Sequence, residues 1–195
     1  EYEELQAVTD LQQAISPDAP RLCDDLPDNI AAAQTEGDAE KVENAFAKAS
    51  HITRMNLVNN RVVGSPLEPR ALLCEIEPKS GNLVLHAMHQ SISRLKAVLC
   101  GVFQLDAENL RIIVRDIGGG FGTKVAVYPE DILVVYAARK LKRTVKWTAT
   151  RSEEFQASVH GRDQRNFAEL AFDPSGKILA LRLSTLANTG AYLNN

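Results

Sequence analysis

The residues best suited to chemistry in this 195-residue chain form a glycine-rich segment, Gly118-Gly119-Gly120-Phe121-Gly122. Glycine can adopt positive φ angles and lets a ligand approach the main chain closely, so such a loop can offer backbone N–H groups to ligand oxygens. The segment fits neither standard phosphate-binding motif. Thr123-Lys124-Val125 has the wrong order for a P-loop, and Thr123 stands where a dinucleotide fingerprint needs Gly or Ala. Two interpretations remain open, a ligand-binding loop and a tight turn without a ligand.

Histidine and cysteine spacing gives no metal site. His86 and His89 are three residues apart, and an odd offset on a strand places side chains on opposite faces. A shared metal would therefore require the strand to end between them. The sequence predicts no metal held directly by its side chains. The cysteines are far apart and form no Cys-x-x-Cys pair, which indicates reduced thiols and a cytoplasmic location; they are Cys23, Cys74 and Cys100.

Two pairs of neighbouring carboxylates are candidates for acid–base chemistry. Glu130-Asp131 is explained by a helix N-terminus, where the helix dipole favours acidic residues. Glu153-Glu154 lies in a charged turn and is expected to be solvated, and His160 is expected to anchor a loop. No Gly-x-Ser-x-Gly or Cys/His nucleophile set is present. A basic cluster is expected to be a solvated helix end: Arg139, Lys140, Lys142, Arg143 and Lys146.

Composition excludes several classes of protein. The chain is 45% hydrophobic and 24% charged with a net charge of −3, which is ordinary for a globular protein and rules out collagen and a disordered tail. No broad basic surface for nucleic acid is implied. No apolar run approaches the ~20 residues that span a bilayer, and no signal peptide is visible. Both ends look cut, so we expect part of a longer polypeptide.

The elements that must position the candidate residues are mixed. The predicted fold class is α+β, with mixed sheets, β-hairpins and packed helices. Prolines indicate an extended connector at 16–28. The expected strands are 1–8, 29–35, 51–63 with a bend at 59–60, 71–77, 83–88, 110–114, 145–148, 166–172 and 178–186. The expected helices are 38–49 with Asp38 as its N-cap, one capped by Ser91 or Ser93, 129–141 with Pro129 in its first turn, and a helical turn at 151–154. The turn residues at 78–82 predict a hairpin between strands 71–77 and 83–88.

Several further segments combine with the glycine segment into a family pattern. They are Pro66-Leu67-Glu68-Pro69-Arg70-Ala71, His89-Gln90-Ser91, Arg151-Ser152-Glu153-Glu154 with His160-Gly161-Arg162, and Ala187-Asn188-Thr189-Gly190-Ala191-Tyr192, which looks like a following strand. In order and spacing the pattern resembles the large subunits of molybdenum hydroxylases, the xanthine dehydrogenase, aldehyde oxidoreductase and carbon monoxide dehydrogenase group. The resemblance makes 30–195 the first part of the molybdopterin-binding domain. It makes 1–29 the end of a hammerhead-like domain and a connector.

The resemblance implies molybdenum held by a pterin dithiolene, usually in the cytosine dinucleotide form in bacterial relatives with separate subunits. Gln90 matches the glutamine whose amide hydrogen-bonds an oxygen ligand of the metal. Phe121 and Gly122 match the backbone that closes over the metal's ligands, and Gly119 and Gly120 let that backbone approach. Iron–sulfur and FAD partner subunits or domains are implied as well.

The resemblance also limits what this chain does alone. Purine-oxidising relatives carry a glutamate where this chain has Val125. This difference favours an aldehyde, carbon monoxide or an N-heterocycle as the small-molecule substrate. The family's catalytic glutamate lies beyond Asn195, so no catalytic residue is assigned here and the chain alone is expected to be inactive. The alternative function is a non-catalytic, stand-alone domain that binds a protein or a phosphorylated ligand at the glycine segment.

Overall fold

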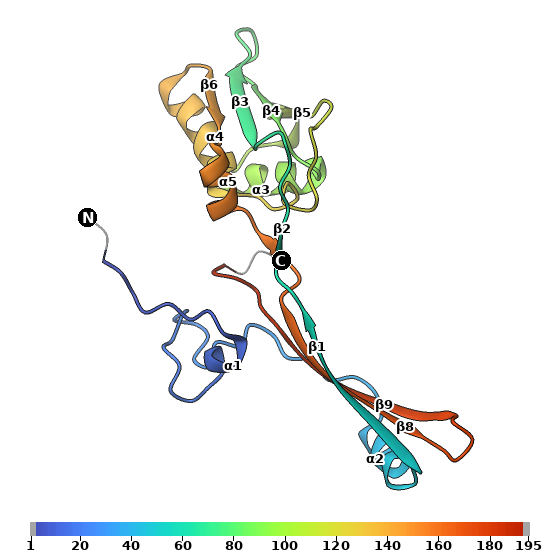
Figure 1. Ribbon diagram of the computed structural model, residues 1–195. Helices are drawn as coiled ribbons and strands as arrows, with labels where there is room; N and C mark the ends of the chain where they lie inside the picture. The colour runs from blue at the N-terminus through green and yellow to red at the C-terminus, as the bar shows by residue number, and fades with distance from the viewer. Residues whose placement is uncertain (1–2, 193–195) are drawn as a thin grey trace. The chain divides into compact units, whose positions relative to one another are not determined.

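The computed structural model describes residues 3–192, which belong to two compact units (Figure 1). One unit contains residues 3–62 and 162–192, and the other contains residues 63–161. Helices and strands are mixed in the chain, as the predicted α+β class requires. None of the helices in the described part is both long and apolar enough to cross a membrane.

Residues 63–161 are built on a four-stranded sheet in the order β5-β4-β3-β6. Strand β3 pairs antiparallel with both β4 and β6, and the hairpin predicted for β3 and β4 is confirmed. Strands β4 and β5 are parallel, so a crossover must connect them, and helix α3 provides it. The strand bounds are Ala71–Ile76 for β3, Leu83–Ala87 for β4, Leu110–Ile113 for β5 and Val145–Thr148 for β6.

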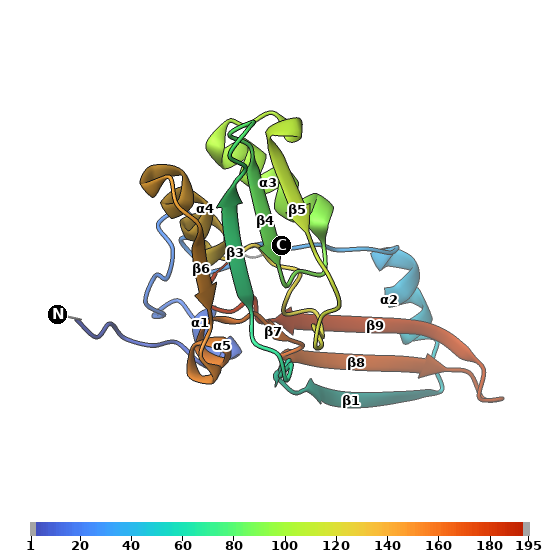
Figure 2. The same cartoon turned by 90° about the horizontal axis from the view of Figure 1, so that it is seen from above.

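Helices α3 (Ile92–Phe103) and α4 (Pro129–Leu141) cover one face of this sheet (Figure 2). The register places alternate strand residues on that face, for example Cys74 opposite Leu85. Fully burying one Leu or Val side chain contributes about 1.5–3 kcal/mol, so this core holds β4 and α4 against each other. The core residues are Leu72, Cys74, Leu83, Leu85, Ala87, Leu95, Leu99, Leu110, Val134, Val135 and Ala138.

The start of α4 is set by its capping residues. Pro129 occupies the first helical position, where its missing N–H costs nothing. Asp131 Oδ2 accepts a hydrogen bond of 2.8 Å from the Tyr128 N–H, which closes a capping box. The helix ends at Leu141 and is followed by the C-cap residue Lys142, which has a left-handed φ of 50°. The predicted bounds of this helix are therefore confirmed, and the glycine segment lies in the connection from β5 to α4.

The other unit contains a three-stranded antiparallel sheet in the order β1-β8-β9. Its strands are β1 (His51–Asn59), β8 (Gln164–Phe172) and β9 (Ile178–Ala187). Helix α2 (Ala39–Ala47) is capped by Asp38, as predicted, and contacts β9. The contact includes the Arg182 guanidinium, which lies 4.3 Å from the centre of the Phe46 ring. A short helix α1 (Leu11–Ala14) is followed by turns and an isolated bridge between Cys23 and Leu26, so the expected extended connector at 16–28 is wrong. Asn29 Nδ2 donates to the carbonyls of Ala14 and Pro20, which folds this stretch back on itself.

Some sequence-based expectations are wrong. Residues 3–8 and 29–35 form no strand, because alternating residues make a stable strand only where a partner supplies a ladder. Residues 1 and 2 lie outside the described residues. Residues 188–192 do not continue β9. The predicted turn at 151–154 is a longer helix, α5 (Arg151–Ala157). The remaining short elements are β2 (Val62–Val63), which pairs with β7 (His160–Gly161), and η1 (Ala107–Asn109).

Candidate functional site

The glycine segment has an unusual backbone. Gly119 and Gly122 have φ angles of 93° and 86°, which confirms the predicted left-handed conformation within this segment. Phe121 also has a positive φ, 47°, and its side chain is 74% exposed. A non-glycine residue in this region costs on the order of 1–3 kcal/mol and persists only where its surroundings enforce it. The left-handed backbone and the exposed apolar ring make Phe121 a candidate for contact with a ligand.

Gln90 lies against this segment and fixes its second half. Gln90 Oε1 accepts hydrogen bonds from the Gly122 N–H at 3.1 Å and the Lys124 N–H at 3.2 Å. The Gln90 N–H donates in turn to the Lys124 carbonyl at 2.8 Å. Because both partners of the side chain are N–H donors, the atom facing them must be the amide oxygen. The amide nitrogen consequently points away from the segment, and Gln90 is exposed.

Three hydrogen-bond donors of this site have no acceptor within residues 3–192. They are the Gln90 Nε2 group and the backbone N–H groups of Gly120 and Phe121. The neighbouring N–H groups are occupied, since Gly119 donates to the Ile117 carbonyl and Thr123 to the Gly120 carbonyl. An amide N–H₂ and two backbone N–H groups suit a ligand that is rich in oxygen or carries negative charge. All five predicted cofactor-binding residues thus lie in one place: Gln90, Gly119, Gly120, Phe121 and Gly122.

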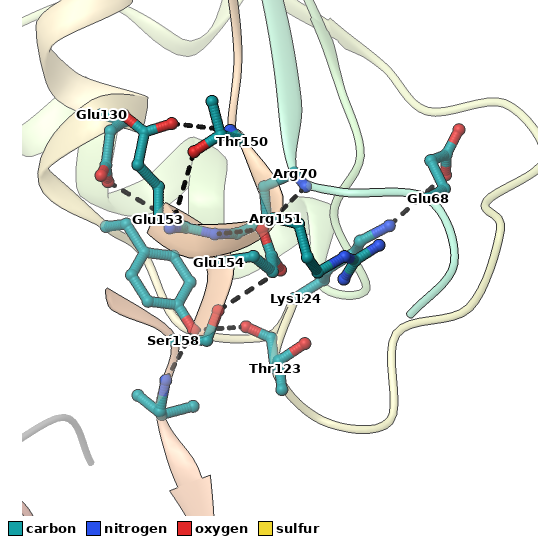
Figure 3. Close-up of polar contacts among 12 residues, drawn as sticks. Glu68, Arg70, Thr123, Lys124, Glu130, Thr150, Arg151, Glu153, Glu154 and Ser158 are labelled. Atoms are coloured by element: carbon teal, nitrogen blue, oxygen red, sulfur yellow. Dashed lines mark hydrogen bonds and ion pairs between the residues drawn. The ribbon is translucent and has the colours of Figure 1, made fainter. Parts of the chain in front are cut away.

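An ion pair that the sequence did not reveal lies beside the segment. The Lys124 side chain is 0% exposed, and its Nζ lies 3.4 Å from Glu68 Oε2 (Figure 3). The same oxygen accepts a hydrogen bond of 2.7 Å from the Gly118 N–H. The sequence signalled Glu68 only by its position between two prolines in the rigid segment Pro66–Arg70. It gave no signal for Lys124, because lysine is rarely buried.

A second buried polar cluster surrounds Arg70 (Figure 3). The Arg70 N–H donates to Glu154 Oε2 at 3.0 Å, and Nη1 donates to Glu130 Oε2 at 3.3 Å. The guanidinium also lies 3.7 Å from the centre of the Tyr128 ring. Glu154 is 1% exposed, so the expectation that it is solvated is wrong. The extension of α5 to Ala157 accounts for the difference, because Glu154 lies inside a helix that packs against Arg70.

The other candidate residues have structural roles. Glu153 is exposed, as expected, and its carboxylate accepts a hydrogen bond of 2.6 Å from the Thr150 N–H at the start of α5. His89 is buried, and burial lowers its pKa below the usual value. Its Nδ1 accepts a hydrogen bond from the Ser91 N–H. Ser91 occupies the N-cap position of α3, but its side chain makes no capping hydrogen bond. No group of three or more His, Cys, Asp or Glu residues among those described could hold a metal.

A small cavity lies among the buried polar groups. Its volume is about 10 Å³, and Arg70, His89, Lys124, Tyr128 and Asp131 contribute to its lining. This volume is about that of one water molecule. Burial raises the pKa of Asp131 to about 6, and the Arg70 charge opposes that rise. This cavity is too small for a cofactor. The candidate binding surface is the exposed side of Gln90 and the glycine segment, where the donors without an acceptor lie.

Comparisons with known proteins identify the family to which the chain belongs. The model of the molybdopterin cofactor-binding domain family matches residues 22–195. The chain is 32% identical, over 98% of its length, to the carbon monoxide dehydrogenase large chain of Hydrogenophaga pseudoflava, of which it covers 25%. It is also 32% identical, over 98% of its length, to the 6-hydroxypseudooxynicotine dehydrogenase complex subunit gamma of Paenarthrobacter nicotinovorans, of which it covers 24%.

Solved structures extend the likeness to three dimensions. The carbon monoxide dehydrogenase of Oligotropha carboxidovorans superposes with a TM-score of 0.85 at 31% identity, over 95% of this chain and 24% of that one. Quinoline 2-oxidoreductase of Pseudomonas putida superposes with a TM-score of 0.83 at 32% identity, over 95% of this chain and 23% of that one. The chain spans about a quarter of the length of the curated relatives it matches. On the match over residues 22–195, this chain belongs to the molybdopterin cofactor-binding domain family.

Proposed function

We propose that this chain is the first part of the cofactor-binding domain of a molybdenum hydroxylase large subunit. The reaction would insert oxygen from water into a C–H bond, or convert carbon monoxide and water to carbon dioxide, with release of two protons and two electrons. The observation that carries the proposal is the orientation of Gln90. Two backbone N–H groups hold its amide oxygen, so its amide nitrogen is left as a donor toward a ligand.

The residues present fit a molybdopterin group. When bound, molybdopterin supplies a metal centre that accepts two electrons from the substrate carbon. Gln90 Nε2 would donate a hydrogen bond to the bound group, and so would the N–H groups of Gly120 and Phe121. The absence of a side chain at Gly120 gives Gln90 its space, since an added Cβ there would lie 2.3 Å from Gln90 Cδ. The exposed Phe121 ring would cover the bound group and exclude water from it.

The substrate class is inferred from the relatives and from one residue. Relatives of this chain include a carbon monoxide dehydrogenase, a nicotine 6-hydroxylase of Paenarthrobacter nicotinovorans and a quinoline 2-oxidoreductase. Val125 is apolar and only partly buried, so it cannot bind a purine edge as a glutamate would. We infer carbon monoxide, an N-heterocycle or an aldehyde as the substrate.

The remaining parts of the enzyme are proposed from the family. We infer the cytosine dinucleotide form of the pterin, an iron–sulfur subunit and an FAD subunit that carry electrons away, and a cytoplasmic location. The division into the end of a hammerhead-like domain at 1–29 and the cofactor-binding domain at 30–195 is part of the same proposal. The base that takes the proton would lie outside this chain. Family membership does not favour the alternative of a non-catalytic domain.

The test uses the full-length protein purified together with the products of neighbouring genes. Molybdenum is measured by elemental mass spectrometry, and the pterin nucleotide by chromatography after oxidation. Dye reduction is then assayed with carbon monoxide, quinoline, nicotine and an aromatic aldehyde. We expect about one molybdenum per large subunit and turnover with one of these classes. Protein that is folded, complete and free of molybdenum would overturn the proposal.

A further inference from the structure

Glu68 links the first residue of the glycine segment to Lys124, two residues beyond its end, through one oxygen atom. Its Oε2 accepts the Gly118 N–H at 2.7 Å and lies 3.4 Å from Lys124 Nζ. The Glu68 N–H returns a hydrogen bond of 3.4 Å to the Gly118 carbonyl, so the two residues bind each other in both directions. The Glu68 carboxylate therefore holds both Gly118 and Lys124.

The segment that carries Glu68 is itself held on both sides. Pro66 is fully buried, and the Leu67 carbonyl accepts a hydrogen bond of 2.8 Å from Arg151 Nη2. Arg70 is buried and bound to Glu154 and Glu130. Little main-chain freedom therefore remains for Glu68, because contacts outside the glycine segment also hold its neighbours.

The glycine segment depends on that carboxylate in two ways. Gly118 packs directly against Glu68, since a Cβ added at position 118 would lie 2.6 Å from Glu68 Cβ. Lys124 is completely buried, and a buried ammonium group needs a nearby negative charge. The Lys124 N–H is also one of the two donors to Gln90 Oε1, at 3.2 Å. A displacement of Lys124 would therefore turn the Gln90 amide.

We propose that Glu68 is a positioning residue for cofactor binding: it fixes Gly118 and Lys124, and through Lys124 it sets the direction of the Gln90 amide nitrogen. This inference rests on the proposed function, because it assigns the Gln90 donor to the molybdopterin group. Glu68 touches no ligand in this assignment, and its effect passes through the segment it holds.

Four variants of the full-length protein test the assignment: Glu68→Ala, Glu68→Gln, the double variant Glu68→Gln/Lys124→Met, and Glu108→Gln. The alanine variant removes the acceptor and the charge, whereas Gln retains an oxygen for the Gly118 N–H and removes only the charge. The double variant also removes the Lys124 charge, which Glu68→Gln alone leaves buried without its partner. Glu108 is an exposed acid in η1 outside the site and serves as the matched control.

Two measurements are made on each variant. Hydrogen–deuterium exchange of residues 118–124 is followed in protein from a host that cannot make molybdopterin, and molybdopterin content is measured in protein from a competent host. We expect Glu68→Ala to raise exchange in this segment about tenfold or more, without a rise in α4, and to lower molybdopterin content severalfold. Glu68→Gln should lose less molybdopterin, and the double variant should regain part of the loss. Glu108→Gln should match the unmodified protein.

Two results would overturn the assignment: unchanged exchange of residues 118–124 in every Glu68 variant, or raised exchange with full molybdopterin content. If an alanine variant fails to fold, the Gln and double variants decide the same question. Failure of the proposed function gives a different result, because the unmodified protein would then hold no molybdopterin. The exchange measured without cofactor would still show whether Glu68 holds the segment.

Discussion

The carboxamide of Gln90 fills the space in which a side chain on Gly120 would begin. An added Cβ at position 120 would lie 2.3 Å from Gln90 Cδ and 2.5 Å from Oε1. Two residues thirty positions apart in the sequence therefore constrain each other. The absence of a side chain at one is the condition for the amide orientation at the other.

Replacing Gly120 with Ala should displace Gln90 and reduce molybdopterin content in the full-length protein. The added methyl group cannot be accommodated at 2.3 Å, so either the amide or the backbone must move. Gly101→Ala is the control, because a Cβ at this position in α3 meets nothing within 4 Å. The control should instead stabilise the helix by about 0.5–1 kcal/mol. Equal molybdopterin content in the two variants would contradict the argument.

Gln90→Glu separates the structural role of Gln90 from its role as a donor. A carboxylate can still accept the Gly122 and Lys124 N–H groups but has no N–H to offer a ligand. We expect an unchanged melting temperature and a turnover number lower by about tenfold or more. Gln90→Ala should show a similar loss of turnover. Normal kcat in a fully loaded Gln90→Ala enzyme would refute the donor role, and a loss of stability alone would indicate a helix-capping role.

Asp131 should make stability depend on pH between about 4 and 6. Burial raises its pKa from 3.8 to about 6, so the folded state holds the proton more tightly than the unfolded state. The stability this provides is fully present below pH 3.8 and is lost as the pH rises through about 6. The loss corresponds to about 3 kcal/mol.

The measurement compares Asp131→Asn with the unmodified protein by denaturant unfolding. Asn retains an oxygen that can accept the Tyr128 N–H and does not ionise. The difference in unfolding free energy between the two proteins should shift in favour of the Asn variant as the pH rises from 4 to 7. A difference that stays constant over this range would show that Asp131 ionises normally.

Removing Glu154 should destabilise the protein strongly. Glu154 is buried and its Oε2 lies 3.5 Å from Arg70 Nε, so Glu154→Ala leaves a buried guanidinium with less compensation. Breaking a buried pair from one side typically costs about 3–5 kcal/mol. The neighbouring Glu153→Gln change is the control, because this exposed residue only caps α5 and Gln can also serve in a capping box. Melting temperatures of the two variants, measured side by side, should differ clearly.

The 195-residue chain expressed alone should neither retain molybdenum nor oxidise aldehydes. We propose that the catalytic base and most pterin contacts lie outside these residues, since the chain spans about a quarter of its relatives' length. The measurement is molybdenum content together with dye reduction, and folding is checked separately by circular dichroism. Stoichiometric molybdenum or turnover in this chain would show that the site is more complete than we infer.

The sequence predicted local structure well where capping or turn residues lie next to the element that they define. Pro129 and the acidic residues behind it gave the start of α4, and the turn at Pro78–Asn82 gave the β3–β4 hairpin. Asp38 gave the start of α2. Such caps and turns depend on contacts within a few residues, so a single sequence contains them.

The contacts that hold the site could not be predicted in the same way. Glu68 and Gly118 are fifty positions apart, and Arg70 and Glu154 are eighty-four apart. Nothing local distinguishes Glu154, which is buried, from its exposed neighbour Glu153. The glycine segment stood out by its residue types and Gln90 through the family pattern, whereas the contact between Glu68 and Lys124 became visible only through burial and distance.

Phe121 has a consequence for protein engineering. Its left-handed backbone would be less strained with glycine or asparagine, and its ring, 74% exposed, contributes little to the folded core. A redesign guided by stability alone would therefore choose this position early and replace the residue. The native sequence retains the strained backbone and the exposed ring of Phe121. This is expected where selection acts on activity and does not maximise stability.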